Sequence, residues 1–233
     1  MIDQAPSHRN GFVTTYLDDV SRCLHSIEPA AVERFLTSLE RAYEDDRQIF
    51  IIGNGGSAST STHIACDLAK NVTPYSLSSA PQSQPIARRL RVISLTDNVA
   101  LITAVANDCG YEHVFSQQLT NLLQKDDLVI AISATGNSPN ILHALRLARD
   151  RRAHTAALLG FGGGRARDLV EVALVVQSDD YGHVEDLHLV MCHLARAWMH
   201  RFCSQSSESV QRHTFSQLQT RAAEWALSDV MDQ

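Results

Sequence analysis

Short apolar runs alternate with amphipathic stretches along most of the chain. The apolar runs lie at residues 48–52, 91–95, 127–133, 154–159 and 171–177. Nearly continuous apolar runs of this length are typical of central strands in a parallel sheet that is covered on both faces. Around these runs, apolar residues recur near helical spacing at 12–46, 57–70, 98–106, 110–124, 138–151 and 184–202.

This alternation predicts right-handed βαβ units and an α/β fold, a doubly wound, five-stranded parallel sheet flanked by helices, of flavodoxin-like type. We interpret residues 1–203 as a single domain that includes a long N-terminal helix, and residues 204–233 as a C-terminal helical tail. Residues 73–87 hold three of the six prolines and predict a long loop, while residues 1–10 predict a short polar tail.

The leading helix carries an apolar stripe near helical spacing, which predicts packing against the sheet or against another subunit. The stripe consists of Tyr16, Val20, Leu24, Ile27, Val32, Phe35, Leu39 and Tyr43.

Composition excludes several classes of protein. Twenty Lys and Arg against 26 Asp and Glu give a net charge of −6, so no basic surplus favours nucleic acid or an anionic membrane. No apolar stretch approaches the roughly 20 residues that span a bilayer, and the N-terminus lacks the apolar core of a signal peptide. The five cysteines are scattered without a CxxC pair, as in a reduced, cytoplasmic protein.

In a doubly wound sheet, ligands bind beyond the carboxyl ends of the strands, and polar loops follow two of the predicted strands there. The first loop, Gly53-Asn54-Gly55-Gly56-Ser57-Ala58-Ser59, leads into a helix. Glycines allow close approach of an anion, and the free N–H groups of a helix start favour negative charge. The alternative is a Gly-rich turn without a ligand.

Nucleotide motifs fit the first loop poorly. No Gly-Lys-Ser/Thr follows, so the loop is not a Walker A motif. Gly53, Gly55 and Ala58 match the dinucleotide fingerprint GxGxxG/A, but that fingerprint needs an acidic residue about 20 positions later, and position 73 is Thr.

The second loop, Ser133-Ala134-Thr135-Gly136-Asn137-Ser138-Pro139-Asn140, also opens a helix. Its hydroxyls and backbone N–H groups are suited to hold a phosphate. The alternative for Ser138 is a simple helix cap. Asp97 follows the second strand, and we expect it either to contact a ligand or to cap the next helix.

Two helical stretches carry side chains that bind metals or move protons. His63 and Asp67 stand four residues apart, and Glu185, Asp186, His188 and His193 lie on the last helix. His188 falls about 140° around the helix from His193 and is expected to lie outside the set. Cys66 and Cys192 lie beside these residues and are expected to be small buried side chains rather than ligands. Gly162-Gly163-Gly164, after the fourth strand, predicts a flexible turn.

The motifs GNGGSAS and SATGNSPN, with ISLTDNVALITAVANDCGYEHVFSQQL between them and VEDLHLVMCHL near the end, resemble those of the sugar isomerase (SIS) domain. Within that superfamily the chain is most similar to the phosphoheptose isomerases, over about residues 12–202. Those enzymes convert sedoheptulose 7-phosphate into glycero-manno-heptose 7-phosphate through an enediol. Members of the family assemble as tetramers through such leading helices, with sites at subunit boundaries, so the resemblance implies a homotetramer.

The resemblance implies a zinc ion, one per subunit, held by His63, Asp67, Glu185 and His193, with Asp67 and His193 as acid/base catalysts. It implies that the two loops bind the sugar phosphate, with further contacts from neighbouring positions. The implied substrate-binding residues are Asn54, Gly55, Gly56, Ser57, Lys70, Asp97, Ser133, Ala134, Thr135, Ser138 and Glu185.

The chain departs from the family pattern at four of these positions. Asp67 replaces a Glu, which shortens the reach of the carboxylate, and Glu185 replaces a Gln, which adds negative charge. Lys70 stands one position before a family Arg, and Ala134 replaces a Thr. Two alternatives to a heptose phosphate isomerase therefore stay open: an isomerase of another sugar phosphate, and a non-catalytic SIS protein that acts as a replication-initiator-associating or phosphosugar-sensing scaffold.

Overall fold

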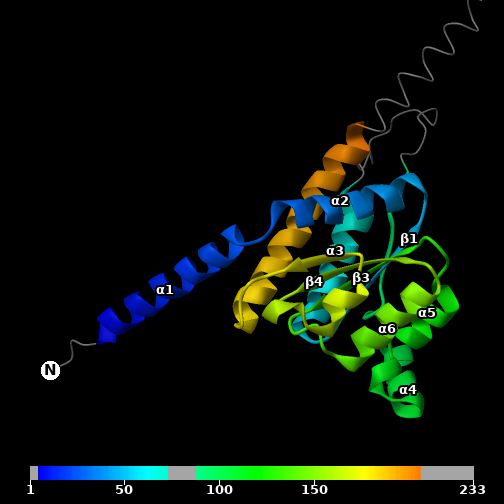
Figure 1. Cartoon of the computed structure of the whole chain (residues 1–233), viewed down its shortest axis with the longest axis horizontal. Coiled ribbons are helices and arrows are strands. Elements are labelled where there is room, and N and C mark those ends of the chain that lie inside the picture. The colour runs from blue at the N-terminus through cyan, green and yellow to red at the C-terminus, as the bar shows by residue number, and fades with distance from the viewer. Residues whose placement is uncertain (1–4, 73–87, 206–233) are drawn as a thin grey trace, which may run out of the picture.

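The computed structural model describes residues 5–72 and 88–205. Five strands form one parallel sheet: β1 (Gln48–Gly53), β2 (Arg91–Ser94), β3 (Leu128–Ser133), β4 (His154–Leu159) and β5 (Val172–Val175). Their order across the sheet is β2-β1-β3-β4-β5 (Figure 1). The doubly wound, parallel sheet is therefore confirmed. Because the chain order runs outward from the boundary between β1 and β3, the topological switch point lies between these two strands.

Helices cover both faces of the sheet. They are α1 (Ala5–His25), α2 (Pro29–Glu44), α3 (Gly56–Asn71), α4 (Val99–Cys109), α5 (Ser116–Leu122), α6 (Pro139–Asp150), the 3₁₀ segments η1 (Tyr111–His113) and η2 (Phe161–Leu169), and a C-terminal helix over residues 181–205. Within the described ranges, none of these helices combines the length and the apolar character that crossing a membrane requires.

Alternation along the strands divides the core into two layers. Ile49 and Ile51 of β1 pack with α2, α3 and the C-terminal helix, whereas Phe50 and Ile52 pack with α4, α5 and α6. Successive strand residues point to opposite faces, and both faces here are apolar. The strands therefore appear in the sequence as continuous apolar runs, because the side chains on both of their faces are buried.

The predicted long leading helix, 12–46, is two helices. α1 ends at His25, and α2 starts at Pro29 after Glu28, whose ψ of 115° is extended. Pro29 has no N–H for the preceding turn, and it disfavours helical geometry at the residue before it. α1 projects from the body of the domain, while α2 lies against the sheet (Figure 1). Of the predicted stripe, Phe35 and Leu39 are buried and Leu24 is exposed.

Other predicted boundaries were also wrong. α1 starts at Ala5, inside the predicted polar tail. The single helix predicted at 110–124 is η1 followed by the short α5. The last helix, predicted at 184–202, spans residues 181–205. The predicted loop 73–87 and residues 206–233 of the predicted tail lie outside the described residues.

Candidate active site

The two polar loops meet at the switch point. β1 and β3 are hydrogen-bonded neighbours, with Gly53 paired to Ile132, so the segments that follow them emerge side by side. Between them lies a cavity of about 140 Å³. It is lined by Asn54, Ser57, Ile132, Ser133, Ala134, Thr135, Ser138, Tyr181 and Glu185. The structure thus brings together most of the predicted substrate-binding residues of both loops.

Glycines shape the first loop. Gly55 precedes α3 with φ of +53°, a left-handed conformation that favours glycine. A Cβ on Gly53 would lie 2.5 Å from the carbonyl oxygen of Ser57, so only glycine allows the loop to turn this tightly. The first N–H groups of a helix have no partner within it, and no side chain caps α3. This end of α3 is therefore suited to an anion.

The hydroxyls of the second loop are arranged around the start of α6. Ser138 occupies the N-cap position, but its side chain makes no capping hydrogen bond, so the cap interpretation does not account for this residue. The Ser133 hydroxyl accepts a hydrogen bond from the Gly136 N–H at 3.2 Å, and the Thr135 hydroxyl accepts one from the Asn137 N–H at 3.3 Å. Both hydroxyls keep their own hydrogens for a ligand.

The triple glycine after β4 does not form a free turn, as the sequence suggested, but supports the second loop. Gly136 has φ of +62°, and a Cβ there would lie 2.0 Å from the Gly163 carbonyl oxygen. A Cβ on Gly164 would lie 2.2 Å from the Thr135 carbonyl oxygen. The Ala166 N–H also donates to the Gly136 carbonyl at 2.9 Å. The two backbones pack too closely for any side chain between them.

Asn54 and Asn140 join the two loops through a reciprocal pair of amide hydrogen bonds of 2.9 and 2.8 Å. Tyr111, from η1, donates its hydroxyl hydrogen to the Asn54 oxygen at 3.1 Å. Sequence reasoning did not single out Asn140 or Tyr111. Asn140 lies inside the second motif and could have been found there, whereas no local signal marks Tyr111.

His63, Asp67 and His193 form a cluster where α3 meets the C-terminal helix. The Nε2 atoms of His63 and His193 are 2.9 Å apart, and His63 Nε2 lies 3.5 Å from Asp67 Oδ2. One ligand atom from each residue lies within 4.8 Å of the other two. The histidines are exposed, while the Asp67 side chain is 16% exposed.

Two imidazole nitrogens and one carboxylate oxygen are a donor set suited to zinc, and a catalytic zinc site keeps one further position open. The same groups can accept and donate protons. The cluster therefore fits a metal-assisted proton transfer.

The fourth predicted metal ligand is placed differently. Glu185 lines the cavity between the loops, and a Cβ on Gly56 would lie 2.5 Å from its Oε2 atom. It lies two turns before His193 on the C-terminal helix and is not part of the three-residue cluster.

Two other predicted contacts lie outside the cavity. The Asp97 carboxylate accepts a hydrogen bond of 2.5 Å from Thr62, next to His63, and Asn98 rather than Asp97 caps α4. Lys70 is exposed one turn after Asp67 on α3 and does not line the cavity.

The two cysteines beside the cluster differ in environment. Cys192 is buried, as predicted, and burial raises the pKa of its thiol to about 12. Cys66 is exposed, contrary to prediction, because it faces outward from α3. Neither belongs to the cluster of three ligand residues.

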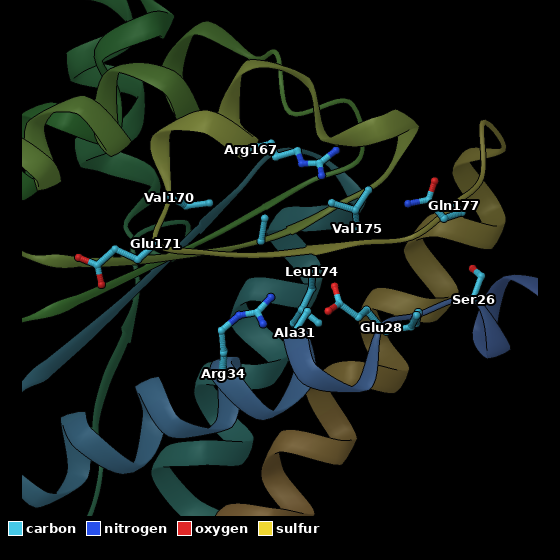
Figure 2. Close-up of a pocket in the computed structure, with 12 residues that line it drawn as sticks. Ser26, Glu28, Ala31, Arg34, Arg167, Val170, Glu171, Leu174, Val175 and Gln177 are labelled. Atoms are coloured by element: carbon cyan, nitrogen blue, oxygen red, sulfur yellow. The ribbon is translucent and has the colours of Figure 1, made fainter.

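A second cavity, of about 270 Å³, lies at the free edge of β5, between α2 and η2 (Figure 2). Arg34 from α2 and Arg167 from η2 extend toward it from opposite sides of the strand, and Glu28 and Glu171 stand nearby. It contains none of the predicted site residues. It is therefore separate from the candidate active site.

A parallel α/β sheet with two hydroxyl-rich loops at its switch point is the arrangement that the resemblance to the SIS domain predicted. The sequence model of the family described as the SIS domain matches residues 15–160.

Curated relatives refine this assignment. A phosphoheptose isomerase of Helicobacter pylori is 37% identical over 164 residues, which cover 70% of this chain and 80% of the relative. A phosphoheptose isomerase of Pelobacter propionicus is 35% identical over 166 residues, 71% of this chain and 82% of the relative. The chain belongs to the phosphoheptose isomerase family of SIS-domain proteins.

Solved structures agree in fold. A phosphoheptose isomerase from Francisella tularensis superposes with a TM-score of 0.72 at 24% identity, covering 85% of this chain and 99% of that one. A phosphoheptose isomerase from Neisseria gonorrhoeae superposes with a TM-score of 0.71 at 24% identity, covering 82% of this chain and 97% of that one. The predicted SIS architecture is therefore confirmed.

Proposed function

We propose that the chain is an aldose–ketose isomerase that converts sedoheptulose 7-phosphate into D-glycero-D-manno-heptose 7-phosphate. Membership of the phosphoheptose isomerase family supports this reaction. The structural observation that carries it is that α3 and the C-terminal helix, which bring His63, Asp67 and His193 together, also supply Ser57 and Glu185 to the cavity between the hydroxyl-rich loops. In this proposal the cavity holds the phosphate of the substrate, and the cluster acts at its carbonyl group.

The spacing along α3 suits a long substrate. Ser57 lies in the cavity at the start of α3, and His63 stands six residues later, which is about 9 Å along the helix axis. An extended sugar chain of seven carbons spans a comparable length. With the phosphate held by Ser57, Ser133, Thr135 and Ser138, the far end of the sugar reaches the cluster. Binding energy at the phosphate thereby orients the reacting carbons.

Proton transfer falls to the two catalytic candidates. In the proposed step, Asp67 removes the proton from the carbon next to the carbonyl. The electron pair of that C–H bond forms a C=C bond, while the carbonyl π bond breaks and its electrons move onto the oxygen, which is protonated to give the enediol. His193, on the C-terminal helix, moves protons at the face of the substrate that Asp67 does not contact. Return of a proton to the neighbouring carbon completes the isomerisation without net oxidation.

We place one zinc ion on His63, Asp67 and His193, as their donor set allows. When bound, zinc supplies Lewis-acid stabilisation of negative charge on a substrate oxygen. Glu185 would join this set only by turning from Gly56 toward the cluster, and because it lines the cavity we assign it a contact with the sugar instead.

The experiment follows purified, zinc-loaded protein with sedoheptulose 7-phosphate by NMR. We expect aldose product from the wild type and a loss of at least about a hundredfold in Asp67→Ala and in His193→Ala, because each removes an acid/base group. Asp150→Ala, which removes an exposed carboxylate at the end of α6, is the matched control and should keep full activity. Removal of the metal with a chelator should also abolish turnover.

Three results would redirect the proposal. Exchange of solvent deuterium into the sugar without product would indicate another sugar phosphate as the substrate. Neither exchange nor turnover in folded, metal-loaded protein would favour the non-catalytic SIS alternative. Full activity in Asp67→Ala would remove that residue from the mechanism.

We further propose that four chains assemble through α1 and the C-terminal helix, and that the enzyme works in the cytoplasm. Phe12 and Leu17 of α1 are 71% and 60% exposed. Val190, Leu194 and Trp198 form an exposed apolar strip next to His193. A partner helix on this strip would cover the exposed histidines and exclude water from the reaction.

A further inference from the structure

The hydrogen bonds of Asn54 leave its carboxamide only one way to interact with a ligand. Its oxygen accepts from Asn140 Nδ2 at 2.8 Å and from the Tyr111 hydroxyl at 3.1 Å, which uses both lone pairs. Its nitrogen donates one hydrogen to Asn140 Oδ1 at 2.9 Å. One N–H of Asn54 therefore has no partner among the described residues, and it belongs to a side chain that lines the cavity.

The backbone of α6 fixes the direction of this amide pair. Two facing carboxamides are satisfied equally well if both are rotated by 180°, so the pair alone does not define which atom faces the cavity. The N–H of Ile141, in the first turn of α6, donates to Asn140 Oδ1 at 3.0 Å. This bond requires the oxygen of Asn140 at that position. It thereby also requires the nitrogen of Asn54 opposite that oxygen.

We infer that Tyr111 and Asn140 are positioning residues that hold the Asn54 carboxamide as a hydrogen-bond donor toward an oxygen of the bound sugar. The inference rests on the proposed function for the identity of the sugar, but the orientation of Asn54 follows from the protein alone. A donor fixed in this way favours a substrate oxygen that gains electron density, since it needs no reorientation during the reaction.

The arrangement links three parts of the fold. Asn54 belongs to the loop after β1, Asn140 to the start of α6 and Tyr111 to η1. A change at η1 is therefore transmitted to the sugar site without contact with the substrate. Tyr111 is 54% exposed, and its hydroxyl is bound to the site through Asn54.

The first test uses ligand-free protein and the side-chain NH₂ signal of Asn54 in ¹⁵N NMR, assigned by its loss in Asn54→Ala. We expect solvent exchange of this signal to be at least about threefold faster in Tyr111→Phe than in the wild type. Asn140→Asp keeps the acceptor for Ile141 but removes the donor to Asn54, and it should accelerate exchange further. Unchanged exchange in both variants would refute the positioning role.

The second test is a double-mutant cycle on turnover of sedoheptulose 7-phosphate. Tyr111→Phe should lower kcat/KM by about three- to tenfold, the usual range for one lost hydrogen bond. In the Asn54→Ala background, the same substitution should change kcat/KM by less than about twofold. Tyr43→Phe is the matched control, because it removes a tyrosine hydroxyl on α2 that belongs neither to the cavity lining nor to the histidine cluster. It should leave kcat/KM unchanged.

The outcomes separate this inference from the proposed function. Additive effects of Tyr111→Phe and Asn54→Ala would mean that Tyr111 acts without Asn54, which overturns the inference while the isomerase activity stands. A wild type that does not turn over the sugar would overturn the proposed function. The exchange measurement would then still decide whether Tyr111 and Asn140 hold Asn54.

Discussion

His188 lies five residues before His193 on the same helix, yet it faces the core. It is 1% exposed, and within the described part of the chain neither of its ring nitrogens makes a hydrogen bond of good geometry. Burial lowers the pKa of His188 to about 4, and the nearby Leu159 carbonyl opposes this effect only in part. The 140° offset read from the sequence correctly separated it from the catalytic candidates.

This burial makes stability depend on pH. The pKa of a histidine in the unfolded chain is about 6.5, so between pH 6.5 and 4 the unfolded state binds a proton that the folded state does not. The stabilisation from a neutral His188 is full above pH 6.5 and is lost as the pH falls toward 4. For a pKa lowered to about 4, the loss is on the order of 3 kcal/mol.

We expect His188→Leu to flatten the dependence of the free energy of unfolding on pH between 6.5 and 4. Urea titrations at several pH values would measure this, with His25→Leu, a change at an exposed histidine of α1, as the control. An equally steep dependence in His188→Leu would show that other groups carry the effect.

At the scale of elements, the second loop depends on η2. Positive φ values at Gly136 and Gly163 and the contact between their backbones hold the loop after β3 against the segment after β4. Gly162, with φ of +78°, has open space where a Cβ would stand. A Cβ would therefore be accommodated at Gly162, whereas the backbone of Gly163 leaves no room for one on Gly136.

Gly136→Ala should therefore cost more than Gly162→Ala. Both add the strain of a left-handed residue with a Cβ, about 1–2 kcal/mol. Gly136→Ala must also move the Gly163 carbonyl, which adds about 1–3 kcal/mol and displaces Thr135 and Ser138. Thermal unfolding and the KM for the sugar phosphate would measure both effects. Similar losses in the two variants would contradict the packing argument.

At the scale of the whole molecule, the projecting α1 and the exposed strip of the C-terminal helix predict assembly (Figure 1). We expect light scattering to give a mass four times the 25.7 kDa of one chain. Leu17→Asp should reduce this mass, because a charge would be buried in the apolar contact, and should lower kcat. Asp18→Asn, at an exposed neighbour on α1, is the control. A wild-type monomer with full activity would exclude the proposed assembly.

Much of the fold could be predicted from local pattern. All five strands lie within about two residues of the apolar runs, because strands covered on both faces exclude polar residues. Both loops were found because their glycines and hydroxyls form short continuous stretches between a predicted strand and a predicted helix. Helix boundaries were less predictable: Pro29 divided a stripe that reads as one helix, since a local backbone constraint overrides apolar spacing.

The sequence by itself determined the sheet, the two loops, and the separation of His63 and Asp67 by one helical turn, because these depend on residues near one another in the chain. Tertiary structure alone decided that His193 meets His63 at 2.9 Å, that Glu185 faces Gly56, and that Tyr111 bonds to Asn54. These contacts join residues 57 to 130 positions apart, and helix packing sets them. No local pattern encodes the angle at which two helices cross the same sheet.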